Sequence, residues 1–199
     1  VTVQPAHYYT QFRTYMWRWG ATISAARTIE EEDWAPDIDE LRKKVSNKTR
    51  AIAMTHPNNP TGAVYDEKDL KSIIDIAGEH NIPVIADEIY GLIAFDGVKV
   101  PSILNLAGDV PAIVLNGMSK FFMRTGWRVG YILFHDPLGK ASKEGQVIRE
   151  IRDWHGLYGH GQDAMPTPIV YAAIKAYQGP MDASFEMLKE TEKRTDYSW

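Results

Sequence analysis

The sequence alternates short runs of β-branched and other apolar residues with longer amphipathic segments, and this alternation limits the possible folds more than any other feature. Such a rhythm is typical of a mostly parallel sheet with helices on both faces. We therefore predict an α/β fold with three layers, helices over sheet over helices. The predicted strands are residues 2–3, 21–26, 50–54, 83–87, 112–115 and 129–134.

The segments between and after these strands have helical features. A helix is predicted over residues 8–19, ending at Gly20, and another over 66–80, with Leu70, Ile73, Ile74 and Ala77 on one face. Asp37 is predicted to cap a helix, with Glu40 following three positions later. Further helices are predicted over residues 140–155, 168–178 and 181–199. Because 156–168 holds three Gly and two Pro, we expect a hinge there, dividing the chain into residues 1–155 and 156–199.

Charge and composition limit the kinds of partner that we expect for this protein. The 22 Lys and Arg and 26 Asp and Glu give a net charge of -4 without long blocks of one sign, so neither a nucleic acid nor an anionic membrane is an expected partner. The chain has no cysteine, which excludes disulfides, thiolate nucleophiles and cysteine-based metal sites, and favours the cytoplasm. The longest apolar stretches, 82–86 and 110–115, fall far short of the ~20 residues of a membrane helix.

Chemically useful residues follow three successive predicted strands: Asn59, then Asp87 with Tyr90, then Lys120. In an open α/β sheet the carboxyl ends of parallel strands share one edge, where ligands bind. Each residue also has an ordinary structural explanation, as a turn, a helix cap, a core aromatic or a surface lysine. Their expected convergence on one crevice favours a shared chemical task.

These residue types match what pyridoxal 5'-phosphate needs from a protein. The cofactor requires a lysine for its Schiff base, a carboxylate that keeps the ring nitrogen protonated, and donors for the phenolic oxygen. Lys120, Asp87, and the pair of Tyr90 and Asn59 fill these roles. Arg128, eight residues after Lys120, offers a planar guanidinium suited to a phosphate.

The same residues resemble the class I aminotransferases, which are fold-type-I pyridoxal-phosphate enzymes. The shared order is Asn-Pro-Thr-Gly, Asp-x-x-Tyr, Ser-Lys and Gly-x-Arg-x-Gly, with 28 residues from Asn59 to Asp87, 33 from Asp87 to Lys120 and 8 from Lys120 to Arg128. The resemblance implies that Lys120 is both the Schiff-base lysine and the general acid–base, and that an amino acid and a 2-oxo acid are the substrates. It also implies a cofactor contact from Ser119, a stacking role for His7, and a homodimer in the full-length protein.

The chain departs from the family pattern at two places. Many members carry Ser or Thr three residues before the lysine, where this chain has Gly117. Phe121 and Phe122 are bulkier than the usual residues after the lysine, and we expect them to pack beneath the site. The resemblance covers only the middle of the family's longer chains, so we expect a central fragment of the large domain whose C-terminal helices lead toward a small domain. By the same resemblance, we expect the family's glycine-rich phosphate turn and the tyrosine that crosses the dimer to lie upstream of this stretch, and the substrate-binding arginine downstream of it.

Three alternatives to transamination stay open. Related β-carbon–sulfur lyases and aminocyclopropane-carboxylate synthases share the four motifs. Aminotransferase-like domains also serve as ligand sensors in some transcription regulators, and an inert folded piece would bind the cofactor weakly or not at all. The segment 125–130 most resembles prokaryotic aspartate and alanine aminotransferases, which favours aspartate or alanine as the amino acid.

Overall fold

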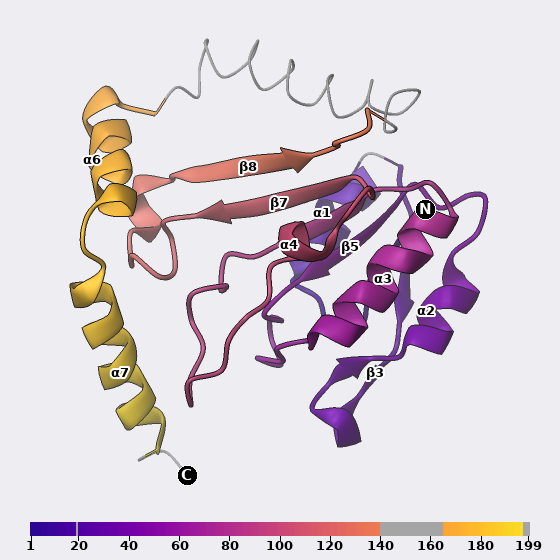
Figure 1. Ribbon diagram of the computed structural model, residues 1–199, viewed down its shortest axis with the longest axis horizontal. Helices are drawn as coiled ribbons and strands as arrows, with labels where there is room; N and C mark the ends of the chain where they lie inside the picture. Colours follow the sequence, from indigo (N-terminus) through magenta and orange to yellow (C-terminus); the bar gives the residue numbers. More distant parts are fainter. Residues whose placement is uncertain (19, 140–164, 197–199) are drawn as a thin grey trace.

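The computed structural model describes residues 1–18, 20–139 and 165–196, which centre on a six-stranded sheet of order β2-β1-β5-β6-β7-β8 (Figure 1). The first five strands in this order are parallel, and β8 runs antiparallel to β7. The mostly parallel sheet predicted from the sequence is thus confirmed. The strands are β1 Thr2–Pro5, β2 Ile23–Ala26, β5 Ala51–Thr55, β6 Val84–Asp87, β7 Ala112–Gly117 and β8 Gly130–His135.

One face of the sheet is covered by α2 (Ile38–Lys44), α3 (Glu67–Glu79) and α4 (Ile103–Leu106), and it holds the main core. The sheet contributes alternate side chains to this core, because successive residues of a strand point to opposite faces. The helix residues predicted to form the apolar face of α3 are all fully buried there: Leu70, Ile73, Ile74 and Ala77. Asp66 caps α3 by accepting a hydrogen bond from the Asp69 N–H, 2.7 Å away.

The opposite face carries α1 (Thr10–Arg18) at the end of the sheet formed by β1 and β2 (Figure 1). Val3 belongs to the core described above, so the neighbouring Thr2 points to the other face, and there its Oγ1 lies 3.8 Å from Met16 Sδ of α1. The three layers predicted from the sequence are confirmed. Gly20, in the left-handed region at φ 72°, follows α1, and the Ala21 N–H returns to the Met16 carbonyl at 2.8 Å.

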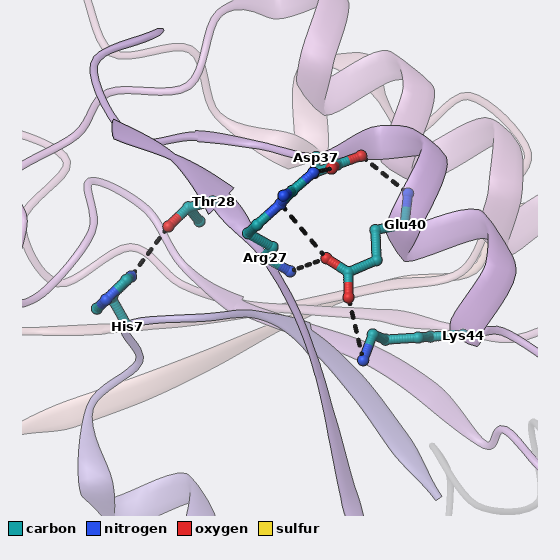
Figure 2. Close-up of polar contacts among 6 residues, drawn as sticks. All are labelled: His7, Arg27, Thr28, Asp37, Glu40 and Lys44. Carbon is teal, nitrogen blue, oxygen red and sulfur yellow. Dashed lines mark hydrogen bonds and ion pairs between the residues drawn. The ribbon is translucent and has the colours of Figure 1, made fainter. Parts of the chain in front are cut away.

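A small hairpin precedes α2 and was not predicted. Its strands β3 (Thr28–Ile29) and β4 (Ala35–Pro36) are antiparallel and flank the 3-10 turn η1 (Glu30–Glu32). Asp37 caps α2 as predicted, accepting from the Glu40 N–H at 2.9 Å. Glu40 does not reach back to the capping residue; its Oε2 accepts instead from the Arg27 N–H at 2.8 Å, which ties α2 to the hairpin (Figure 2).

The C-terminal part contains α6 (Thr167–Gln178) and α7 (Asp182–Asp196), which lie beyond one end of the sheet (Figure 1). Both agree with the predicted helices within the described residues. The predicted helix at 140–155 and the proposed boundary between residues 155 and 156 lie outside the described residues. The part of the chain that the structure describes contains no helix with the length and apolarity that a membrane span needs.

Candidate active site

Asn59 and Tyr90 meet beyond the ends of two neighbouring parallel strands. β5 leads into the turn that holds Asn59, and Tyr90 follows the last residue of β6. Asn59 Nδ2 donates a hydrogen bond of 3.1 Å to Tyr90 Oη. The Tyr90 loop is itself closed by the Gly91 N–H, which donates to the Glu88 carbonyl at 2.8 Å. An amide and a phenol are therefore held together, and both can bond a ligand oxygen.

Lys120 brings an ammonium group to the same place. It follows β7, and its Nζ lies 5.4 Å from the centroid of the Tyr90 ring, within cation–π distance. The backbone turns at Lys120, because its carbonyl accepts from the Met123 N–H at 2.9 Å. The half-buried side chain thus extends from a fixed turn toward Tyr90.

Asp87 is the last residue of β6, between Thr55 on β5 and Leu115 on β7. Its Oδ1 accepts a hydrogen bond of 3.1 Å from the Ile89 N–H. Burial raises the pKa of the Asp87 carboxyl above its ordinary value, while the Ile89 hydrogen bond and the charge of Lys120 act in the opposite direction. The carboxyl is therefore a partly desolvated group that interacts with the positive charge of Lys120.

Asn59, Asp87, Tyr90 and Lys120 are thus brought together at the carboxyl edge of β5, β6 and β7, as the sequence predicted. Two of the remaining predicted residues share one turn. Ser119 accepts, through its carbonyl, a 2.9 Å hydrogen bond from Thr125 Oγ1, and Arg128 Nη1 donates to the Thr125 carbonyl at 3.0 Å.

Thr125 opens the 3-10 turn η2 (Thr125–Trp127), which joins Ser119 to Arg128. This supporting role of Thr125 was not predicted from the sequence. Arg128 follows the turn in the left-handed region at φ 55°, and its side chain is exposed. The contact with the Thr125 carbonyl uses one of the five N–H donors of the guanidinium, which keeps donors for an anion.

His7 follows β1 and contacts the hairpin of β3 and β4. Its Nδ1 lies 2.9 Å from Thr28 Oγ1 (Figure 2), and its ring meets the edge of Trp34 with centroids 4.8 Å apart. These contacts connect the loop after β1 with the hairpin. The stacking role expected for His7 stays a prediction.

The two departures from the family pattern have a physical explanation. A Cβ at Gly117 would lie 2.5 Å from the Val129 carbonyl oxygen, because Gly117 pairs closely with Gly130 of the antiparallel β8. A Ser or Thr there would need the backbone to move. Phe121 and Phe122 are buried in a cluster with α6, so they are packing residues, as predicted.

A buried polar cluster supports the turn that carries Asn59. Asn58 Oδ1 accepts from Thr61 Oγ1 at 2.9 Å, and Asn58 Nδ2 donates to Tyr65 Oη at 3.3 Å. His56 is fully buried, and burial lowers the pKa of its imidazole to about 4, so it is neutral at pH 7. The neutral ring fits its contacts, donating from Nε2 to the Pro101 carbonyl at 3.1 Å and accepting at Nδ1 from the Tyr65 N–H at 3.4 Å.

Glu88 supports the loop that carries Tyr90, which gives a prediction for stability. Its Oε1 accepts from Ser102 Oγ at 3.1 Å and from the Ile103 N–H at 2.8 Å. Glu88→Ala is expected to lower the free energy of unfolding by about 1–3 kcal/mol, because it leaves a buried N–H without an acceptor. Glu88→Gln keeps an oxygen at this position and should retain most of the stability. Chemical denaturation measures both variants, and equal losses would contradict the assignment.

The fold and the site together define a class of protein. An open α/β sheet presents a lysine, a partly buried carboxylate, and a bonded tyrosine and asparagine at one edge, with a guanidinium in the loop after the lysine. These donor groups suit pyridoxal 5'-phosphate, which needs an amine, a carboxylate, oxygen donors and a phosphate partner.

Comparison with known proteins agrees with a site for pyridoxal 5'-phosphate. The family model for aminotransferase class I and II matches residues 1–197, and the chain belongs to this family, whose members are pyridoxal-phosphate dependent. Aromatic-amino-acid aminotransferase 2 of Thermococcus litoralis is 39% identical over 175 residues, covering 86% of this chain and 42% of the relative. The aspartate aminotransferase of Bacillus sp. (strain YM-2) is 36% identical over 168 residues, covering 83% and 40%.

A solved structure matches over the whole chain. The alanine aminotransferase from Pyrococcus furiosus superposes with a TM-score of 0.88 at 43% identity, covering 100% of this chain and 48% of that one. The chain therefore spans less than half the length of each of these relatives.

Proposed function

We propose that the protein is a pyridoxal-phosphate-dependent aminotransferase that exchanges an amino group between an amino acid and a 2-oxo acid. The observation that carries this proposal is the meeting of Lys120, Tyr90 and Asn59 beside Asp87 in a chain of this family. Bound there, the cofactor supplies an electron sink that lets the α-proton of the amino acid leave. The lyase and synthase alternatives, and the ligand-sensing one, have less support, because the relatives described above are named as aminotransferases.

Each side chain then has a proposed role. Lys120 holds the cofactor and moves the proton to and from the α-carbon, and Asp87 keeps the ring nitrogen protonated. Tyr90 and Asn59 bind the phenolic oxygen. Arg128 and Ser119 bind the phosphate, and His7 stacks on the ring.

The substrate and assembly are further parts of the proposal. Aspartate or alanine is the favoured amino acid, which agrees with the names of an aspartate and an alanine aminotransferase among the proteins compared. We propose a cytoplasmic homodimer. Residues 1–155 would then be the central part of the cofactor-binding domain, with 156–199 leading toward a small domain.

The experiment that tests the function is an absorbance spectrum of the full-length protein with added pyridoxal phosphate. Borohydride reduction and peptide mapping follow. We expect a new long-wavelength band and a label on Lys120, because its amine lies beside Tyr90. Addition of aspartate or alanine should then bleach the band, with pyridoxamine phosphate and a 2-oxo acid as products. A label on another lysine would refute the site. A product formed without pyridoxamine phosphate, such as a 2-oxo acid released together with free ammonia, would favour a lyase or synthase.

A further inference from the structure

Thr55, at the end of β5, is a buried polar residue that the proposed roles leave unexplained. Its side chain is only 2% exposed, and its Oγ1 has no hydrogen-bond partner within the described part of the chain. Buried hydroxyls in native proteins nearly always have a partner, because an unpaired one costs free energy. An orphaned hydroxyl at the edge of a candidate active site therefore suggests a partner in the working protein.

The register of the sheet places Asp87 beside Thr55. Thr55 pairs with Asp87 across the parallel strands β5 and β6, and the His56 N–H bonds to the Asp87 carbonyl at 2.9 Å, which keeps the pairing intact there. Neighbouring strands lie about 4.8 Å apart, and paired residues point to the same face. The side chains of Thr55 and Asp87 are therefore immediate neighbours on one face.

Gln4 is a second buried polar residue on this face. It is 1% exposed, and both atoms of its amide are also without a hydrogen-bond partner among the described residues. Since Thr2 pairs with Ala51, Gln4 points to the same face of the sheet as Ala51 and Thr55. Two unpaired polar side chains thus occupy the face onto which Asp87 projects.

Asp87 has room for another donor. The structure gives its carboxyl one hydrogen bond, to Oδ1 from the Ile89 N–H, and a carboxylate has about four acceptor positions. Rotation of Thr55 about its Cα–Cβ bond to another staggered position re-aims the hydroxyl without moving the backbone. The backbone pairing therefore permits a hydrogen bond between the two side chains.

We propose that Thr55 is a positioning residue for Asp87, donating a hydrogen bond from its hydroxyl to the Asp87 carboxylate and so fixing its orientation and favouring its ionised form. The role of Asp87 toward the cofactor rests on the proposed function, but the contact between the two residues does not. If Thr55 were present only as a good strand former, valine would replace it without consequence for Asp87, because the two side chains have nearly the same shape.

The test is the titration of Asp87 in the cofactor-free, full-length protein. Carbon-13 NMR follows protein labelled at the aspartate side-chain carboxyl carbon, and Asp87→Asn assigns the signal. This label excludes the neighbouring Glu88, and Lys120 is unchanged in every sample, so its charge contributes equally. In Thr55→Val the midpoint of Asp87 should rise by about one pH unit, since one hydrogen bond to a charged group is lost. Thr55→Ser keeps the hydroxyl and should keep the original midpoint.

Cofactor affinity gives a second measurement without turnover. Thr55→Val should weaken binding of pyridoxal phosphate by about tenfold, and Thr55→Ser should bind nearly as the parent does. An Asp87 midpoint that is the same in Thr55→Val and the parent would overturn the inference while leaving the function intact. A protein that binds no cofactor would refute the proposed function, yet the carboxyl titration would still report whether Thr55 acts on Asp87.

Discussion

Lys120→Ala is expected to lose both transamination and borohydride-dependent labelling by pyridoxal phosphate in the full-length protein. The amine of Lys120 lies 5.4 Å from the centroid of the Tyr90 ring, and alanine leaves no group there that can bond the cofactor or carry a proton. Loss of a general acid–base alone costs roughly 10²–10⁴-fold in rate, so we expect a fall of at least about 10⁴-fold when the covalent role is lost as well. Steady-state kinetics and peptide mapping measure the two effects.

A matched control is Lys99→Ala, which removes an exposed lysine from the loop before α4. It should keep the rate and the label of the parent. Circular dichroism of Lys120→Ala should show an unchanged fold, because its half-buried side chain lies outside the main core. A Lys120→Ala protein that transaminates at the parental rate would disprove the assignment of the lysine.

The parts of the fold that the sequence predicted are those with a long, repeated pattern. The alternation of apolar and amphipathic segments predicted each strand of the main sheet. The predicted boundaries differ from those in the structure by at most two residues at either end. The hairpin of β3 and β4 was missed because each strand has only two residues, too few for a period. Its turn also lacks a glycine, since Asp33 and Trp34 adopt the left-handed region themselves, at φ 52° and 64°.

The candidate site also has residues that the sequence predicted and residues that it did not. Asn59, Asp87, Tyr90 and Lys120 were predicted to lie together because each ends or follows a recognisable strand, and the structure places them at one edge of the sheet. The buried groups that support them were missed: His56, Asn58, Tyr65 and Glu88. The partners of His56 and Glu88 include residues far along the chain, such as the Pro101 carbonyl and the Ile103 N–H, which no local pattern indicates. Thr55 looks like an ordinary strand residue in the sequence, and only the pairing of β5 with β6 places it beside Asp87.

Asp87→Asn is expected to move activity and stability in opposite directions. Transamination should fall by several orders of magnitude, because asparagine has no charge to keep the cofactor's ring nitrogen protonated and the electron sink is weakened. The cofactor-free protein should nevertheless be more stable at pH 7 than the parent. Asparagine can still accept the hydrogen bond from the Ile89 N–H through its side-chain oxygen, so the local turn is preserved.

The sign of the stability change follows from the pKa of the Asp87 carboxyl, which burial raises above the ordinary value of 3.8. Between these two pKa values the folded protein binds more protons than the unfolded chain, so stability falls as the pH rises through that window and stays lower above it. Asp87→Asn removes this dependence, whereas Asp109→Asn, at an exposed position, should leave both activity and stability unchanged. Denaturation curves at pH 4 and pH 7 test the difference. A variant less stable than the parent at pH 7 would show that Asp87 serves the fold, whereas greater stability with little turnover means that its charge is retained for the chemistry.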